Sequence, residues 1–249
     1  MDKIKARGLD ITSFTLHLLA MGFMLLDHMW ATIVPGNSWM TCVGRMAFPI
    51  FAFMIVEGYY HTSNFGRYVR RLLICAVLSE VPFDMMYGGT WFYPFHQNVI
   101  WTFLIALLAI YLIEKIKEKG KWVITVPAGA VIMAIAAIVG SFTFVDYYSY
   151  GVLTVFVFYL FRGHKWYHYV GQLLGLYLVH GVLFTGQYYI IPLFGYDFEL
   201  QQQALAIGSL VFIWLYRGRQ GLHNRFVQYG FYLFYPVHML ILGLIQYVR

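Results

Sequence analysis

The sequence predicts an all-α fold, a polytopic membrane bundle of about nine transmembrane helices. Composition is the first reason: 61% of the 249 residues are hydrophobic and only 11% are charged, whereas soluble domains carry about 25% charged residues. The mean hydropathy of +0.65 agrees with this. The second reason is the placement of the cations. Of the 17 Lys and Arg residues, all except Arg45 and Arg249 fall in five clusters, which are separated by pairs of apolar spans.

These basic clusters predict the topology. Cytoplasmic loops of membrane proteins carry the excess of Lys and Arg, so every second connection is assigned to the cytoplasm. The amino terminus is then cytoplasmic and the carboxyl terminus outside, in a plasma or inner membrane. The clusters are Lys3, Lys5 and Arg7; Arg67, Arg70 and Arg71; Lys115, Lys117, Lys119 and Lys121; Arg162 and Lys165; and Arg217, Arg219 and Arg225.

The apolar spans follow these clusters in order. Odd-numbered spans begin at a basic cluster, and even-numbered spans lead back to the next one. A helix needs about 20 apolar residues to cross the hydrocarbon. We expect spans at about 10–31, 39–60, 68–86, 96–114, 122–142, 147–161, 166–184, 201–216 and 229–247. The sixth is short, and the segment 186–198 is expected to be an interfacial piece, a re-entrant piece or a loop. A single domain over residues 1–249 accounts for all of them.

Composition also excludes several classes of function. The net charge of +6 lies in the inward loops, where it meets anionic membrane lipids, and the basic residues are not interleaved with aromatics as on a nucleic-acid surface. We therefore expect no nucleic-acid partner. The two cysteines, Cys42 and Cys75, predict neither a disulfide nor a metal site. No HExxH or GxSxG motif is present, so we expect no metal and no serine nucleophile.

Titratable side chains inside predicted spans indicate a functional site, because they are costly at membrane depth. The first span contains His17, Asp27 and His28. Eleven residues are close to three helical turns, so His17 and His28 share one stripe and are expected to line one cavity at depths about 16 Å apart. His28 is the expected general base. Asp27 is expected to support it or to bind the acceptor.

Further polar residues gather by depth toward the predicted outer leaflet. They are Arg45 in the second span, Glu80 and Asp84 in the third, and His96 and Asn98 at the start of the fourth. The candidate substrate-binding residues are Glu80, Asp84, His96 and Asn98, together with His17 and Glu57 nearer the inner side. The alternative is that these groups form buried ion pairs, for instance Arg45 with Asp84 or Glu80, which stabilise helix packing and do no chemistry. The lone histidines His180 and His238 are expected to be core residues.

Several segments resemble the TraX family. They are Met24–His28, Gly44–Phe53, Val56–Gly58, Arg71–Leu73, Ser79–Asp84, Asn98–Phe103, Asp146–Tyr147, Tyr150–Leu153 and Phe234–His238. They occur in order over almost the whole chain, and the Asp-His pair with Gly-Arg-x-Ala-Phe-Pro is specific. TraX proteins are named for the pilin N-acetylase of conjugative plasmids, and they are similar to a wider group of membrane acyltransferases.

The resemblance implies an acyltransferase with acetyl-CoA as donor, entry of CoA from the cytoplasm, and a first-helix histidine, here His28, as catalytic base. The wider group has a basic residue eleven positions before that histidine, where this chain has His17. A buried histidine is mostly neutral at pH 7, so a permanent charge is not expected there. Arg45 is expected to stabilise the oxyanion, and Arg67, Arg70 and Arg71 to contact the phosphates of CoA.

Two other classes of function stay open on the sequence alone. A proton-coupled transporter also places titratable groups at several depths. A non-catalytic membrane assembly factor would use the same groups as structural ion pairs. For an enzyme, the acceptor is a small molecule, a glycan, a lipid headgroup or a protein amino terminus, attacked through an amine or a hydroxyl near the outer face.

Overall fold

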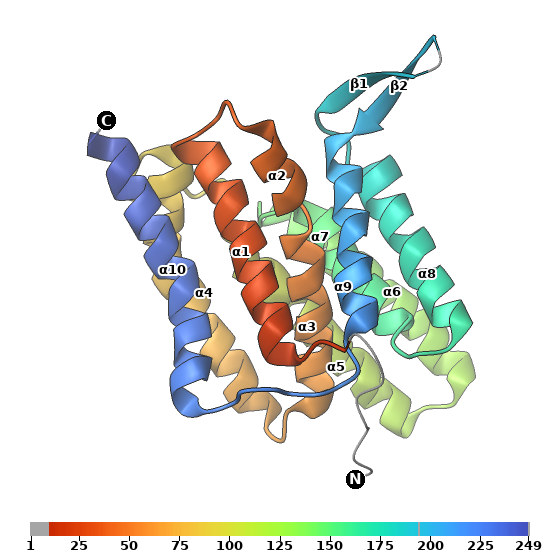
Figure 1. Ribbon diagram of the computed structural model, residues 1–249. Helices are drawn as coiled ribbons and strands as arrows, with labels where there is room; N and C mark the ends of the chain where they lie inside the picture. The colour runs from red at the N-terminus through yellow and green to blue at the C-terminus, as the bar shows by residue number, and fades with distance from the viewer. Residues whose placement is uncertain (1–9, 194, 249) are drawn as a thin grey trace.

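The computed structural model describes residues 10–193 and 195–248, which form a helical bundle with one β-hairpin at its upper end (Figure 1). The basic cluster Lys3, Lys5 and Arg7 and the terminal Arg249 lie outside the described residues. The helices are α1 Ser13–Thr32, α2 Ser38–Gly44, α3 Ala47–His61, α4 Phe65–Gly88, α5 Val99–Lys119, α6 Trp122–Phe142, α7 Tyr148–Leu160, α8 Trp166–Leu176, α9 Ser209–Leu215 and α10 Arg225–Val248. The π-helix η1 (Tyr177–Leu183) extends α8, and the 3₁₀ helix η2 (Gln202–Gly208) precedes α9.

The long elements run up and down, so their connections alternate between two ends of the bundle (Figure 1). The four described basic clusters all fall in or beside connections at the lower end: α3 to α4, α5 to α6, α7 to α8, and α9 to α10. The upper end carries the α1–α2 turn, the loop 89–98, the loop 143–147 and the hairpin. This two-sided arrangement is what the spacing of the basic clusters predicts, and it makes the lower end the basic one.

Five helical segments are long and apolar enough to cross a membrane, namely α1, α2 with α3, α5, α6 and α10. The helix α7 and the η2–α9 segment are apolar but shorter, and α4 is long but carries several charged residues. Length and composition therefore establish a membrane protein, and they support fewer spanning helices than the nine predicted. The exposed face of α6 is apolar, with Ile124, Val131 and Ile135 all more than half exposed. Such a face is suited to lipid and not to water.

Two predicted elements differ from the observed ones. The expected continuous span 39–60 is divided, because α2 ends at Gly44 and α3 begins at Ala47. The segment 186–198 contributes to a two-stranded antiparallel hairpin, β1 Tyr188–Leu193 and β2 Tyr196–Gln201. Aromatic and β-branched residues in β1 favour an extended chain, and Pro192 is tolerated because the strand lies at an edge.

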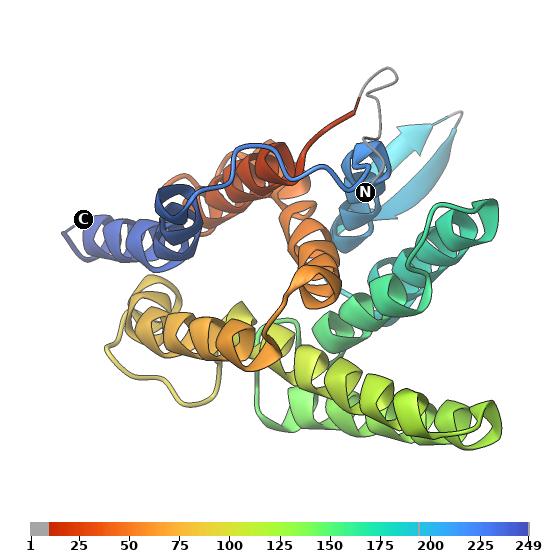
Figure 2. The same ribbon diagram turned by 90° about the horizontal axis from the view of Figure 1, so that it is seen from below.

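The helix α3 lies in the middle of the bundle when it is viewed from the lower end (Figure 2). It packs against α1, α5, α7 and α9, and its residues Ile50, Ala52 and Val56 are almost fully buried. The break between α2 and α3 thus lies at the upper end of this central helix, where it brings irregular backbone next to α1.

Candidate functional site

A cavity of about 120 Å³ lies in the upper part of the bundle, where α1, the α2–α3 break, α4, α5 and α10 converge. Its charged and polar lining residues are Asp27, His28, Arg45, Tyr87, Asp146, Tyr147 and Tyr235. Met24, Phe48, Phe51, Phe103 and Phe184 are among the apolar ones. A mainly apolar cavity with a few converging polar groups is typical of a ligand or catalytic site.

Arg45 occupies the break between α2 and α3 and binds Asp27 of α1. Its Nη2 donates to both carboxylate oxygens of Asp27, each at 2.6 Å. Gly44 allows this approach, because a Cβ at that position would lie 2.4 Å from the Cβ of Asp27. The expected ion pair of Arg45 with Asp84 or Glu80 is therefore wrong. Asp27, Arg45, Glu80 and Asp84 all lie toward the upper end of the bundle, but Asp27 is the carboxylate on α1, the helix that packs closely against α2.

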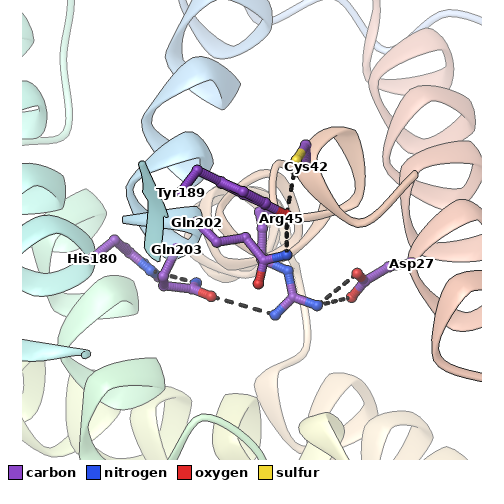
Figure 3. Close-up of polar contacts among 7 residues, drawn as sticks. All are labelled: Asp27, Cys42, Arg45, His180, Tyr189, Gln202 and Gln203. Atoms are coloured by element: carbon purple, nitrogen blue, oxygen red, sulfur yellow. Dashed lines mark hydrogen bonds and ion pairs between the residues drawn. The ribbon is translucent and has the colours of Figure 1, made fainter. Parts of the chain in front are cut away.

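A second set of hydrogen bonds holds the other side of the Arg45 guanidinium (Figure 3). Nη1 donates to Oε1 of Gln203 at 3.3 Å, and the amide nitrogen of Gln203 lies 2.9 Å from Nδ1 of His180. His180 Nε2 lies 2.9 Å from Thr154 Oγ1, whose hydroxyl donates to the carbonyl of Tyr150. Since that hydroxyl proton is committed, Thr154 accepts from His180 Nε2–H, and His180 Nδ1 accepts from Gln203.

Every donor in these hydrogen bonds meets an acceptor, so the side-chain amide of Gln203 is oriented with its oxygen toward Arg45. His180 is presented from the π-helix η1, an element that is often found at functional sites. The Nε of Arg45 is buried and has no hydrogen-bond partner among the described residues. Arg45 is thereby held in place at both Nη atoms, and its buried Nε–H has no acceptor among the described residues.

His28 is held by a histidine of the last helix and not by Asp27. Nδ1 of His28 lies 2.7 Å from Nε2 of His238, and Nδ1 of His238 lies 2.7 Å from the carbonyl oxygen of Phe234. A carbonyl can only accept, so a neutral His238 donates from Nδ1 and accepts at Nε2. His28 then donates from Nδ1, and its Nε2 carries the lone pair. None of the described residues forms a hydrogen bond to that nitrogen.

Asp146 enters the same cavity from the loop before α7. Its Oδ1 lies 3.4 Å from Nε2 of His96, in the loop before α5. The contact with Asp146 raises the pKa of His96 above its ordinary value of 6.5, and this outweighs the opposite effect of partial burial. His96 also contacts the ring of Tyr87, which lines the cavity. The pair therefore lies at the upper rim of the site.

Two predicted site residues lie at the lower end, away from the cavity. His17 bonds the carbonyl of Ser13 at 2.7 Å through Nδ1 and stacks on Phe231 of α10, so the expectation that it lines one cavity with His28 is not met. Glu57 accepts from Nε of Arg162 at 2.6 Å, an ion pair near the ends of α3 and α7.

Three others bind neighbouring backbone or helices and do not line the cavity. Glu80 accepts from the side chains of Asn98 and Trp101, which joins α4 to the start of α5. Asn98 caps α5 by accepting from Ile100 N. Asp84 accepts from the backbone N–H of Tyr93 at 2.8 Å. Their position at the upper end agrees with the predicted depth, but their side chains have structural partners.

The predicted phosphate-binding arginines begin α4 at the lower end. Arg67 and Arg70 are exposed, whereas Arg71 is partly buried. They are thus far along α4 from the cavity, at the basic end of the bundle. Among the described residues no group of three or more His, Cys, Asp and Glu side chains is placed to hold a metal ion.

His180, His238, Gln203 and Asp146 are site residues that the sequence did not indicate as such. The two histidines are buried, as expected of core residues, but their hydrogen bonds lead to cavity-lining groups. The available signal was that His238 and Asp146 belong to two of the resembling segments, Phe234–His238 and Asp146–Tyr147. Nothing in the local sequence indicated Gln203.

The fold and the cavity define a polytopic helical membrane protein with titratable groups in its interior. The family model described as "TraX protein" matches residues 13–246, so the chain belongs to the TraX family. The chain is also similar to the "Probable fimbrial assembly protein FimC, serogroup H1" of Dichelobacter nodosus. The two are 28% identical over 253 residues, which cover 95% of this chain and 96% of that protein. No solved structure matches the chain.

Proposed function

We propose that the protein is an integral membrane acetyltransferase of the plasma or inner membrane. It transfers an acetyl group from cytoplasmic acetyl-CoA to an amine or hydroxyl near the outer face, with His28 as general base. The observation that carries the proposal is the series of hydrogen bonds that runs from the carbonyl of Phe234 through His238 to His28. A histidine that is oriented by a second group, with a free lone pair in a cavity, is the arrangement that proton abstraction requires.

The groups around His28 support acyl transfer in particular. When the acceptor attacks the thioester, the carbonyl oxygen becomes negative, and a fixed donor in a poorly hydrated site stabilises it. Arg45 lines the cavity, is held by Asp27 and Gln203, and has an uncommitted Nε–H. We assign this donor to the oxyanion. Asp27 then acts as a positioning residue for Arg45 and not as the partner of His28.

The size of the cavity limits how acetyl-CoA fits. A volume of about 120 Å³ is well below the 300 Å³ or more of sites that enclose drug-sized ligands. It suits the acetyl thioester and the nearest atoms of the pantetheine arm, and the nucleotide must remain outside. On the proposed topology the lower end is cytoplasmic, so Arg67, Arg70 and Arg71 are assigned to the CoA phosphates.

The reaction is balanced without a further reactant. The acceptor nitrogen or oxygen forms a bond to the acetyl carbon, and its proton passes to Nε2 of His28. The C–S bond breaks, and His28 returns the proton to the departing thiolate, which gives free CoA. His28 is neutral before and after the transfer, and His238 needs no change of tautomer.

The test is release of CoA from acetyl-CoA by the detergent-purified protein, for wild type, His28→Ala and His28→Gln, with and without an amine or sugar acceptor. General-base catalysis contributes about 10²–10⁴-fold, so both variants are expected to lose at least a hundredfold in rate. The matched control is His17→Gln, the same substitution in the same helix but outside the cavity.

The name of the relative from Dichelobacter nodosus also favours a role in fimbrial assembly, and the second candidate function is such a role without catalysis. In that case His28→Gln would support assembly as well as wild type, and acetyl-CoA would not bind. A proton-coupled transporter would likewise bind no acetyl-CoA but would move a solute across vesicles. Absence of both CoA release and acetyl-CoA binding would overturn the acetyltransferase proposal.

A further inference from the structure

The cavity contains two carboxylates, and only one of them has a permanent cation as partner. Asp27 receives two hydrogen bonds of 2.6 Å from Arg45. The side chain of Asp146 meets the imidazole of His96 at 3.4 Å and the backbone N–H of Tyr147 at 3.1 Å. Among the described residues, no Lys or Arg forms an ion pair with Asp146. Its charge is therefore available within the site.

A carboxylate in a small, mostly apolar cavity is costly unless a cation or several donors accompany it. Hydroxyl groups of Tyr87, Tyr147 and Tyr235 share this cavity, but they carry no positive charge that could balance Asp146. The Arg45 guanidinium is balanced by Asp27. Whenever His96 is neutral, the site thus has a surplus negative charge, and it then favours a ligand that brings a positive one.

The backbone around Asp146 is unusual in a way that independently indicates a function. Phe144, Tyr147 and Tyr148 have φ values of +54°, +64° and +48°, a region that is costly for residues other than glycine and that clusters at functional sites. Hydrogen bonds to the neighbouring segment hold the loop. Asp146 N–H donates to Gln97 O at 2.8 Å, and Thr102 Oγ1 donates to Asp146 O at 2.6 Å. These contacts hold the carboxylate at the cavity in spite of the strain.

We propose that Asp146 is an acceptor-positioning residue that binds the cationic, protonated form of a primary amine at the upper rim of the cavity. The inference rests on the proposed acetyltransferase function and assigns a residue of this chain to the binding of an amine acceptor. The ammonium loses one proton to water at the rim. The neutral amine then attacks the thioester, and His28 transfers the second proton from nitrogen to the sulfur of CoA. The net products are the acetamide, CoA and one proton.

His96 regulates the charge that the acceptor meets. Its side chain is 31% exposed and that of Asp146 is 27% exposed, so the pair is in contact with the outer solution. Around His96 lie Glu80, Asp84 and Tyr87 of α4, Asp146 ahead of α7, and Tyr148 at the start of α7. A protonated His96 neutralises Asp146 and competes with the acceptor, whereas a neutral His96 leaves the carboxylate free.

The test compares glycinamide with glycolamide, an amine and a hydroxyl of nearly the same shape, as acceptors. The ratio of their kcat/KM values is expected to fall at least tenfold in Asp146→Asn, mainly through the KM for glycinamide, and to fall less in Asp146→Glu, which keeps the charge. The control is Asp197→Asn, the same substitution at an exposed residue of β2. A change of less than twofold in Asp146→Asn, or a wild type that prefers glycolamide, would overturn the inference.

A binding measurement separates this inference from the proposed function. A ligand that binds only the folded protein raises the melting temperature. We expect glycinamide, at concentrations where glycolamide has no effect, to stabilise wild type, Asp146→Glu and Asp197→Asn but not Asp146→Asn. If this pattern appears with neither CoA release nor acetyl-CoA binding, the acetyltransferase proposal fails and the cation site at Asp146 stands. If CoA release depends on His28 and the pattern is absent, only the role of Asp146 fails.

Discussion

Replacement of Gly44 by alanine is expected to separate Arg45 from Asp27. An added Cβ would lie 2.4 Å from the Asp27 Cβ and 3.0 Å from its Cα. Ordinary contact begins at 3.4 Å, so α1 and α2 must move apart by about 1 Å or the Asp27 side chain must turn away. The two bonds of 2.6 Å between Arg45 and Asp27 would then exceed the range of a hydrogen bond.

The expected magnitude follows from this displacement. Overpacking of this kind costs about 1–3 kcal/mol in stability, and a shift of about 1 Å in a catalytic group lowers the rate about 10²-fold. The assay is CoA release together with the melting temperature of the detergent-purified protein. The control is Gly22→Ala in the neighbouring stretch of α1, where an added Cβ meets nothing within 4 Å. Wild-type CoA release and melting temperature in Gly44→Ala would refute the reasoning about the site.

Three further predictions concern the groups that hold the site together. His238→Phe is expected to reduce CoA release about 10²-fold or more, because His28 loses the acceptor for its Nδ1–H. His238→Gln should retain part of the CoA release, since its amide oxygen can accept that hydrogen bond. Equal loss in both variants would contradict the tautomer assignment. Arg45→Met is expected to destabilise the protein by about 3–5 kcal/mol in thermal or denaturant unfolding, since it leaves the Asp27 carboxylate buried without its partner, and a neutral effect would contradict the pairing. The pKa of His96 is raised in the folded protein, so its pairing with Asp146 stabilises the fold below pH 6.5 and this contribution disappears as the pH rises through the raised value. The melting temperatures of wild type and His96→Gln should accordingly differ at low pH and converge at high pH, and a constant difference would exclude the pair as the cause.

The sequence predicted the order and direction of the helices well, because hydropathy and basic clusters are both local signals. The first span was expected at about 10–31, and α1 covers Ser13–Thr32. The break at Arg45 was missed because residues on both sides are apolar and hydropathy is continuous across it. The hairpin was missed because a short apolar and aromatic run such as Tyr-Tyr-Ile-Ile-Pro is equally compatible with an interfacial segment.

The composition of the site was harder to predict than the helices. Depth placed Arg45 level with both Asp27 and Asp84, and it could not decide which helices are neighbours. His28 and His238 are 210 positions apart, so their contact depends on the packing of α1 against α10, which no local pattern encodes. Asp146 lay in a predicted loop, where a single carboxylate is usually solvated. Only its strained backbone and its position in the cavity distinguish it.

The arrangement of the buried groups also bears on the choice between catalysis and proton-coupled transport. A proton pathway needs titratable groups that can exchange protons in series from one face of the bundle to the other. Below the cavity, two titratable residues of the helices bind nearby partners: His17 forms a hydrogen bond to the carbonyl of Ser13, and Glu57 forms an ion pair with Arg162. Within the cavity, two separate chains of hydrogen bonds end in complementary groups, a lone pair on His28 and a free donor on Arg45. With the roles that we propose for His28 and Arg45, a base and an oxyanion donor in one small cavity would meet the two requirements of acyl transfer, and they would give no advantage to the passage of a solute.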